Sequence, residues 1–274
     1  MAAEPARSEL SGLLARCDLP PPGTPVMCAV SGGADSLALL WLAAAAGCAP
    51  TAIHVDHGLR PGSAAEAAVV AAAAAQVGAA FAAIRVDVEP GPNLEARARS
   101  ARYAALPRGV LTGHTADDQA ETVLLNLLRG AGIDGLSGFV PANRPLRRLR
   151  RRETVAVCAS AGWQPVSDPT NMDPAFRRNR VRHELLPLLD DIAARDVVPV
   201  LARQAALLGD EASLLDELAA DLDPTDARAL AAASPVLARR AVRRWLRSGP
   251  ELHPPDAAAV DRVLAVARGE VVAC

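Results

Sequence analysis

One segment of the chain combines residue types that could bind phosphate: Ser31-Gly32-Gly33-Ala34-Asp35-Ser36 lies between an apolar run and a helical stretch. Glycines let successive backbone N–H groups turn towards an anion, and a helix N-terminus adds its positive dipole end. Asp35 suits a phosphate site if its carboxylate reaches a cation such as Mg²⁺. The pattern is neither a Walker loop nor G-x-G-x-x-G, which disfavours both of those nucleotide-binding classes. The alternative is a tight Gly-Gly turn with Asp35 as a helix cap.

A second group of candidate residues lies in the run from His114 to Glu121. Asp117 and Asp118 fall at a predicted helix start, where acids compensate the helix dipole whether or not they do chemistry. Asp118 and Glu121 are three residues apart and therefore share one helical face, directed at the same mouth as Asp35. Two acids together can hold an ammonium group and accept a proton when an amine becomes a nucleophile. Helix capping is the competing interpretation.

Positive charge is concentrated between residues 144 and 182, although the chain as a whole has a net charge of −2 and a pI near 6.2. Ten arginines and three acids give this segment a net charge of +7, which is typical of a surface that binds a nucleic-acid backbone. A solvated charged face is the simpler interpretation. The arginines are Arg144, Arg147, Arg148, Arg150, Arg151, Arg152, Arg177, Arg178, Arg180 and Arg182.

The elements that must position these residues follow from hydrophobic periodicity. Short apolar runs predict strands at 26–30, 51–55, 82–88 and 110–111, and the stretches 36–46, 66–77, 94–106 and 117–128 are predicted helices. Strands that are apolar throughout and joined by helices form a parallel sheet covered on both faces. We therefore expect a doubly wound, mainly parallel α/β domain over residues 1–190.

The rest of the chain, residues 191–274, is predicted to be a small helical domain. Helices are expected at 197–222, at 235–246 after a Ser234 cap, and from 254–256 onward. The helix that starts at Pro235 carries a second row of arginines, which could contact another part of an RNA.

Composition excludes several classes of protein. With 51% hydrophobic and 22% charged residues over 274 positions, the chain is neither disordered nor collagenous. The five cysteines show no metal-binding spacing, and no signal peptide or membrane-spanning run is present, so we expect a cytoplasmic protein with reduced thiols. The chain contains no lysine, which codon bias is sufficient to explain.

The phosphate-binding segment resembles the pyrophosphate loop of the ATP-pyrophosphatase (PP-loop) superfamily, an adenine-nucleotide alpha-hydrolase-like variant of the Rossmann fold. Further segments, in order over roughly residues 26–190, resemble the tRNA(Ile)-lysidine synthetase family within it. These segments are His54–Arg60, Asn93–Glu95, Ala98–Arg99, Arg102–Tyr103, Gly113–Thr122, Leu128–Gly130, Gly135–Leu136, Arg144–Leu146, Asp168–Asn171 and Arg178–Arg182.

The resemblance implies an enzyme that ligates free L-lysine to C2 of the wobble cytidine in the isoleucine tRNA with a CAU anticodon. ATP first adenylates the cytidine and releases pyrophosphate, and the lysine ε-amine then displaces AMP to give lysidine. The cofactors implied are ATP and Mg²⁺. The partners are tRNA(Ile) and free lysine, with no membrane, and a homodimer is one option for the oligomeric state, which the sequence leaves open.

The resemblance also assigns roles to individual residues. Asp35, Asp118, Glu121 and Arg99 are the expected catalytic residues, and Asp35 also binds the metal. Lysine is held by Asp118, Glu121 and Arg180, with Arg178 the next choice to Arg180. ATP is bound by Ser31, Gly32, Gly33, Ala34, Asp35, Ser36 and His57. The concentration of positive charge, rather than the resemblance, assigns the tRNA contact to Arg144, Arg147, Arg148, Arg150, Arg151, Arg152, Arg177, Arg178 and Arg182, and Trp163 or Phe176 are candidates for base stacking.

Two alternatives remain at this stage. A tRNA thiolase of the same superfamily also adenylates a base but needs cysteines that carry sulfur or a cluster, and none here are paired in sequence. A non-catalytic ATP-binding or RNA-binding module needs no acid pair facing the phosphate loop. One departure from the family is the C-terminus, because its members usually continue past the helical tail; a naturally short or a truncated chain fits equally.

Overall fold

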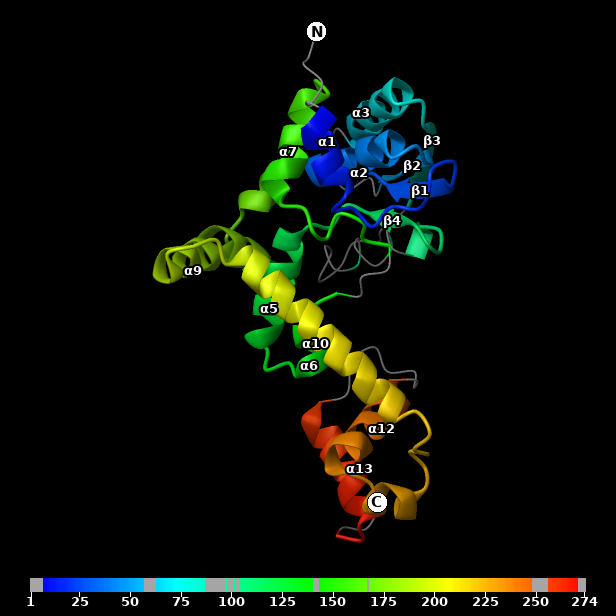
Figure 1. The fold of residues 1–274 in the computed structure, drawn as a ribbon, viewed down its shortest axis with the longest axis vertical. Coiled ribbons are helices and arrows are strands. Elements are labelled where there is room, and N and C mark those ends of the chain that lie inside the picture. The colour runs from blue at the N-terminus through cyan, green and yellow to red at the C-terminus, as the bar shows by residue number, and fades with distance from the viewer. Residues whose placement is uncertain are drawn as a thin grey trace. The chain divides into compact units, whose positions relative to one another are not determined.

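A computed structural model describes residues 7–56, 63–86, 97, 101, 104–139, 143–166, 168–247 and 256–270 (Figure 1). The chain forms two compact units. The first comprises Met1–Ala131 and Gly138–Ala205, and the second comprises Gly132–Ser137 and Ala206–Cys274. In the described part of the chain, no helix has the length and apolar character needed to cross a bilayer.

The first unit is built on a four-stranded parallel sheet, which confirms the α/β class. Its strands are β1 (Pro25–Ala29), β2 (Ala49–Asp56), β3 (Ala80–Arg85) and β4 (Leu111–Thr112), in the spatial order β3-β2-β1-β4. The chain moves outward from β1 to β3 and then returns to the other side of β1. The strand order therefore reverses between β1 and β4, and the crevice at such a reversal is where open α/β sheets bind ligands.

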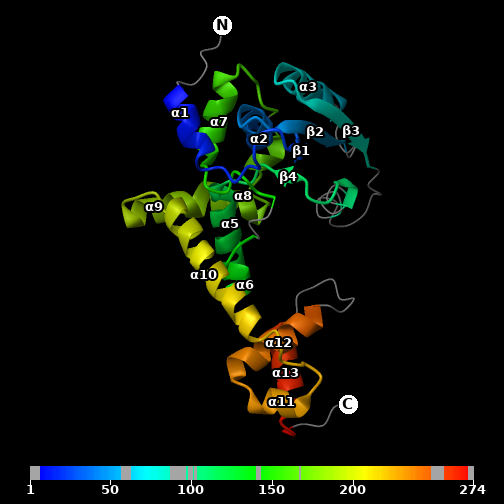
Figure 2. The same cartoon turned by 45° about the vertical axis from the view of Figure 1, so that its right-hand side comes forward.

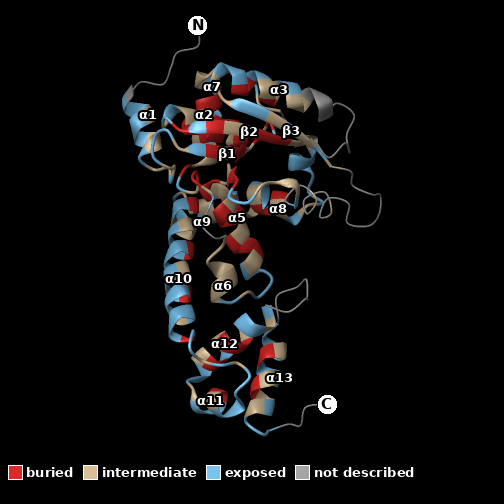
Figure 3. Ribbon diagram, turned by 90° about the vertical axis from the view of Figure 1, so that its right-hand side faces the viewer, coloured by how far each residue is buried: buried red, intermediate tan, exposed pale blue. Residues whose placement is uncertain are grey.

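The sheet's main covering helix is α2 (Ala34–Ala45), in which Leu37, Leu39, Leu40 and Leu42 are completely buried. It packs against β1, β2 and α7 (Arg151–Ser160), while α3 (Ser63–Gln76) packs against β2 and β3. Figure 3 shows α2, α3 and α7 along one face of the sheet, with α1 (Arg7–Leu14) beside them. Buried side chains of β1, β2, β4, α2, α3 and α7 form one core, against which α1 packs.

A second core lies around α5 (Ala116–Leu127), the helix that directly follows β4. Ala120 and Leu124 of α5 pack with Val181 and Leu186, which belong to a composite helix later in the chain. That helix consists of α8 (Arg177–Arg180), a π-helical turn η2 (Val181–Leu185) and α9 (Leu186–Ala193). Through this packing, the arginine-rich segment is brought against the acidic helix α5.

The second unit is helical. It contains α6 (Ile133–Leu136), most of α10 (Val198–Leu218), α11 (Ala227–Ala232), α12 (Pro235–Arg247) and α13 (Ala257–Ala267) (Figure 2). Buried side chains of α11, α12 and α13 share a core. Arg240 joins them, because its guanidinium donates to Asp216 at 2.7 Å, to Ala212 O at 2.9 Å and to Asp134. The short helix α6 is thus part of the helical unit although it lies far upstream in sequence.

Element boundaries differ slightly from the sequence-based expectations. Helix α2 begins at Ala34, two residues earlier than predicted, because extended Gly33 is its N-cap. Helix α7 was not predicted, since its arginine-rich start was interpreted only as a basic surface. Most of the helix predicted at 94–106, the end of the strand predicted at 82–88 and Pro254–Pro255 lie outside the described residues.

Candidate active site

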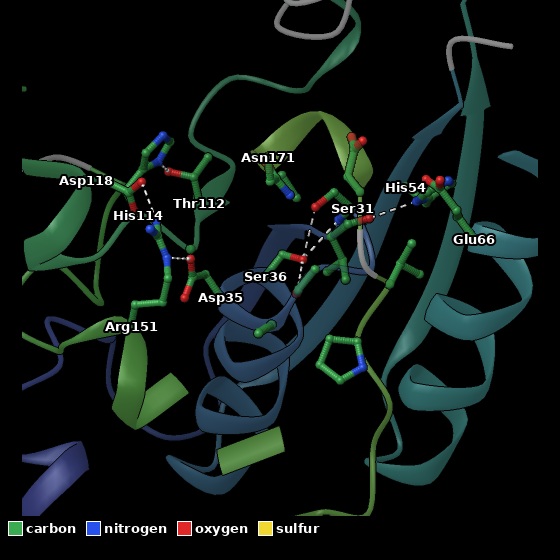
Figure 4. A pocket seen from close by; sticks show the side chains of 18 of the residues that line it. Ser31, Asp35, Ser36, His54, Glu66, Thr112, His114, Asp118, Arg151 and Asn171 are labelled. Atoms are coloured by element: carbon green, nitrogen blue, oxygen red, sulfur yellow. Dashed lines mark hydrogen bonds and ion pairs between the residues drawn. The ribbon is translucent and has the colours of Figure 1, made fainter. Parts of the chain in front are cut away.

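A cavity of about 620 Å³ opens at the carboxyl ends of β1 and β4, where the strand order reverses (Figure 4). The phosphate-binding segment after β1 and the start of α5 after β4 both contribute to its wall. Helix α7 adds Arg151, and the 3-10 helix η1 (Pro169–Met172) adds Asn171. The loop and the helix that were singled out from the sequence therefore share one cavity.

The loop that contains Ser31 and Ser36 is held closed by its own hydrogen bonds. Ser31 N–H donates to Ser36 Oγ at 3.1 Å, and Ser36 Oγ donates to Gly33 O at 2.8 Å. Gly32 has φ +88°, in the left-handed region that glycine adopts without strain, and its carbonyl accepts from Val166 N–H at 2.9 Å. No side chain caps the N-terminus of α2 at Gly33, and Gly33 and Ala34 line the cavity, so the positive end of the helix dipole faces it.

Gly113 allows the end of β4 to approach this loop closely. A Cβ atom at Gly113 would lie 2.4 Å from the carbonyl oxygen of Asp35 and 2.9 Å from the nitrogen of Ser36. These are backbone atoms, which cannot swing away as a flexible side chain could. Gly113 was noted in the sequence only as part of a motif, and the contact shows that it sets the spacing between the two sides of the cavity.

Asp35, Asp118 and Glu121 form an acid cluster whose three carboxylates contact one guanidinium, that of Arg151. Arg151 Nε donates to Asp35 Oδ2 at 3.1 Å, Nη2 to Asp118 Oδ1 at 2.8 Å and Nη1 to Glu121 Oε1 at 3.2 Å. Figure 4 shows Arg151 reaching between Asp35 and Asp118, beside the loop that carries Ser31 and Ser36. The expected proximity of the three acids is therefore present in the structure.

Asp35 sits next to the phosphate-binding loop and has a second partner on α7. Thr154, which is fully buried, donates its hydroxyl proton to Asp35 Oδ1. Burial raises the pKa of the Asp35 carboxyl above its ordinary value, and the nearby Arg151 guanidinium offsets this only in part. Thr154 was not identified from the sequence, because the helix that carries it, α7, was not predicted.

Asp118 serves as a helix cap and a cavity residue at once. Thr115 donates its N–H to Asp118 Oδ2 at 2.9 Å and its hydroxyl to the same oxygen at 3.0 Å, while Oδ1 faces Arg151. Burial alone would raise the pKa of Asp118, but Arg151 and the Thr115 N–H hold it below its ordinary value. The capping interpretation and the site interpretation are thus compatible, because each uses a different oxygen.

Glu121 has no exposed side-chain surface and is bound by two further arginines. Arg178 Nε donates to Glu121 Oε2 at 2.8 Å. Arg182 donates to both carboxylate oxygens, at 2.7 Å and 3.1 Å. Three guanidinium groups therefore face three carboxylates, so the site is balanced in formal charge.

Arg180 has a different environment from these two arginines. Its side chain is 60% exposed and pairs with Glu184 at 2.8 Å, away from the acid cluster. Its contact with the lysine carboxylate stays a prediction. The four-residue spacing of Arg178 and Arg182 places them on one helical face with Arg180 on another, a signal present in the sequence that was not used.

The other arginines predicted to bind tRNA fall into two groups. Arg150 pairs with Asp117 at 3.0 Å and with Asp196, Arg147 pairs with Asp18 at 3.0 Å, and the Arg144 guanidinium stacks 4.2 Å from the centre of the Phe139 ring. Arg148, Arg152 and Arg177 are exposed, with 74% of the Arg152 side chain open to solvent, although Arg148 pairs with Asp18 and Arg152 lies 3.6 Å from Asp196. Their tRNA contacts stay predictions.

Two predicted residues, His57 and Arg99, lie outside the described residues. The neighbouring His54 was not predicted as a site residue, yet it lines the cavity. Its ring is buried, with Nδ1 2.9 Å from Val30 O. Its position near the end of β2 was the available signal, since strand ends at this edge of the sheet meet the crevice.

Comparisons with known proteins identify the family to which the chain belongs. A family model described as PP-loop domain matches residues 7–189. The tRNA(Ile)-lysidine synthase of Nocardia farcinica is 44% identical over 283 aligned positions, which cover 96% of this chain and 89% of that protein. The same enzyme of Rhodococcus erythropolis is 45% identical, over 82% of this chain and 74% of its own length.

A solved structure with the same fold is the U34-tRNA thiolase NcsA from Methanococcus maripaludis with its 4Fe–4S cluster. Its TM-score is 0.57, over 74% of this chain and 77% of that one, and its sequence identity of 18% makes it evidence for the fold alone. The family model and the two relatives at 44% and 45% identity establish the family of this chain. The chain belongs to the tRNA(Ile)-lysidine synthase family, which consists of ATP-dependent ligases with a PP-loop domain.

Proposed function

We propose that this chain joins free lysine to C2 of the wobble cytidine in the isoleucine tRNA that carries a CAU anticodon. In the first step the C2 oxygen attacks the α-phosphorus of ATP, and pyrophosphate leaves. In the second step the lysine ε-nitrogen forms a bond to C2, the C2–oxygen bond breaks, and AMP departs with that oxygen while the nitrogen gives up a proton. The observation that carries this proposal is that Asp118 lines the same cavity as the phosphate-binding segment, with Arg151 bridging it to Asp35 of that segment.

The polyphosphate of ATP is assigned to the segment 31–36. The N-terminal end of α2 and the Ser31 hydroxyl provide hydrogen-bond donors there, while the Ser36 hydroxyl donates to Gly33 O and holds the loop in shape. The helix dipole adds a favourable field for negative charge. Gly32, Gly33 and Ala34 are assigned to the same polyphosphate through their backbone atoms, since they lie in the same segment.

Asp35 is the residue assigned to Mg²⁺. Among the described residues, no three His, Cys, Asp or Glu side chains are arranged as a metal site. One carboxylate beside a phosphate loop nevertheless fits Mg²⁺, which is usually held by one or two carboxylates together with substrate phosphates and water. When bound, Mg²⁺ neutralises charge on the leaving pyrophosphate. Thr154 holds one oxygen of the Asp35 carboxylate by a hydrogen bond and so limits its rotation.

Asp118 and Glu121 are assigned to the lysine side chain. Asp118 Oδ1 and Glu121 Oε1 already accept from a single cationic group, so a lysine ammonium could be bound by the same two oxygens. Asp118 lines the cavity and is the carboxylate placed to take the proton that the amine loses. An arginine of the segment 178–182 is assigned to the lysine carboxylate; Arg182 lines the cavity, whereas Arg180 would have to leave Glu184.

The exposed arginines of the basic segment are assigned to the tRNA backbone, where Arg148, Arg152 and Arg177 present charge to solvent. The helical unit is assigned a share of the same contact through the arginines of α12. We place the reaction in the cytoplasm, which supplies tRNA, ATP and lysine and keeps cysteines reduced, as the described Cys17, Cys28, Cys48 and Cys158 are.

The test is mass spectrometry of nucleosides from CAU-anticodon tRNA(Ile) after incubation with the folded protein, ATP, Mg²⁺ and isotope-labelled lysine. We expect labelled lysidine, with AMP release that depends on lysine. Methionine tRNA with the same anticodon is the matched control and should stay unmodified. Since the chain contains no lysine, the label cannot come from the protein itself. Folded protein that yields no lysyl adduct would exclude the proposal, and AMP release independent of lysine would favour a thiolase-type reaction.

A further inference from the structure

The guanidinium of Arg151 occupies the place that a lysine ammonium needs. It is the group that bridges all three acids, with donor–acceptor distances between 2.8 and 3.2 Å. It also separates Glu121 from the cavity, because Arg151 and Asp118 line the cavity whereas Glu121 does not. A cation that approaches Glu121 from the cavity therefore meets Arg151 first.

Arg151 can leave without orphaning any of the acids, which matters because an unpaired buried charge is costly. Asp35 retains the Thr154 hydroxyl, and Asp118 retains the Thr115 N–H and hydroxyl. Glu121 retains Arg178 and Arg182. Arg178 and Arg182 are less free to leave than Arg151, because they provide the remaining hydrogen bonds of the fully buried Glu121 carboxylate.

The displaced guanidinium has a new partner available when ATP is bound. Arg151 lines the same cavity as Ser31, Gly33 and Ser36, the residues that surround the expected polyphosphate site. A guanidinium stays charged in any environment and matches phosphate oxygens bidentately. Without ATP, however, released Arg151 would exchange three carboxylates for water.

We propose that Arg151 is a built-in counter-ion of the acid cluster, that incoming lysine takes its place, and that bound ATP receives the released guanidinium. This inference rests on the proposed function. It makes Arg151 a positioning residue that couples the two substrates. Coupling is reciprocal, so ATP tightens lysine binding and lysine tightens ATP binding by the same factor.

The first test uses the unmodified full chain without tRNA. Equilibrium dialysis measures the Kd of labelled lysine in the absence and presence of Mg²⁺ and α,β-methylene ATP, an analogue that cannot release pyrophosphate. We expect the analogue to lower the lysine Kd roughly 5–150-fold, the usual range for coupled sites. Equal lysine Kd values in both conditions would overturn the inference.

The second test removes the guanidinium. In Arg151→Met the acid cluster keeps its other partners but has an uncompensated negative charge, so lysine should bind without nucleotide more tightly than to the parent. The ATP analogue should then tighten lysine binding no further. Arg203→Met is the matched control, because Arg203 is an exposed arginine of the same unit to which no substrate is assigned. In the control variant the ATP analogue should lower the lysine Kd by the same factor as in the parent.

The outcomes separate the inference from the proposed function. A folded Arg151→Met protein that binds lysine no better than the parent without nucleotide would overturn the counter-ion role. If Arg151→Met does not fold, Arg151→Lys replaces it and should lower the coupling factor, because an ammonium cannot span three carboxylates; an unchanged factor would contradict the inference. If lysine binds none of these proteins under any condition, the proposed function fails and the inference fails with it.

Discussion

Arg182 forms a two-pronged pair with Glu121, Nε to Oε1 at 2.7 Å and Nη2 to Oε2 at 3.1 Å, although the two residues are 61 positions apart. The carboxylate is wholly inaccessible to solvent. Because Arg178 and Arg151 bind the same carboxylate, Glu121 ties α5, α7 and the α8–η2 helix to one point. Glu121, which is assigned to lysine binding, therefore also stabilises the packing of three helices in the first unit.

Glu121→Gln should destabilise the protein by about 3–5 kcal/mol. The neutral amide removes the negative charge that Arg151, Arg178 and Arg182 share, and these guanidinium groups stay partly buried around it. Urea unfolding followed by circular dichroism measures the free energy of unfolding. Glu184→Gln is the control, since Glu184 pairs with Arg180 on the exposed surface, where ion pairs contribute little. Similar losses in both variants would contradict the central role of Glu121.

Asp118→Asn should reduce lysine transfer far more than it reduces ATP binding. The change removes the negative charge at the oxygen that faces the cavity and leaves an acceptor for the Thr115 cap. Lysine-dependent AMP release measures transfer, and dialysis with labelled ATP measures nucleotide binding. Equal activity of variant and parent would exclude Asp118 from lysine binding.

Asp118 should also contribute to the pH dependence of stability. Its pKa is lowered in the folded protein from an ordinary value of 3.8, so its contribution is fully present above pH 3.8 and is lost as the pH falls through the folded value. The difference in free energy of unfolding between parent and Asp118→Asn should therefore narrow on acidification below pH 3.8. Urea titrations at a series of pH values measure the free energy of unfolding of both proteins. A difference between them that does not change with pH would show that the pKa of Asp118 is not shifted by folding.

Gly113→Ala should abolish ATP binding or folding, because the new Cβ would lie 2.4 Å from the Asp35 carbonyl oxygen. Gly12→Ala is the matched control. Gly12 lies within α1 with no atom in the way, and alanine there should stabilise the helix by up to about 1 kcal/mol. Thermal unfolding and nucleotide dialysis of both variants measure the difference. Normal ATP binding by Gly113→Ala would mean that the loop and β4 can separate.

Arg152→Gln should weaken tRNA binding and lower its salt dependence, because an exposed arginine that neutralises one phosphate releases about one counterion. The slope of log K against log salt concentration should fall in magnitude by roughly 0.7–0.9. Filter binding at several salt concentrations measures this slope. Arg203→Gln, an exposed arginine outside the basic segment, is the control and should leave the slope unchanged.

The sheet could be predicted because its strands are short, mostly apolar runs separated by helical stretches. The run 26–30 corresponds to β1 within one residue, and 51–55 lies inside β2. The phosphate-binding segment and the acidic start of α5 were identifiable for a similar reason, since each directly follows a strand. Helix α7 was missed because Arg150, Arg151 and Arg152 obscure the short apolar face that includes Val157 and Cys158.

The direction of the arginine side chains could not be deduced from charge counting. A net positive segment predicts a surface for phosphate, yet Arg151, Arg178 and Arg182 turn inward because a buried carboxylate 30 to 61 positions away accepts their hydrogen bonds. Such pairs depend on how α5 packs against later helices, and that packing is a tertiary property. Helical periodicity could have shown that Arg180 lies on a different face from Arg178 and Arg182. It could not have identified Glu121 as the partner of the latter two arginines.

The pairing of Arg240 with Asp134 has a consequence for synthesis of the chain on the ribosome. The two residues are 106 positions apart, and Asp134 belongs to the six-residue segment 132–137 that is part of the helical unit. At about 5–20 residues per second, Asp134 is made roughly 5–20 s before its arginine. The helical unit therefore cannot be completed while the first unit is being translated, and a fragment cut out after residue 205 would be made without the acid that Arg240 and Arg247 share.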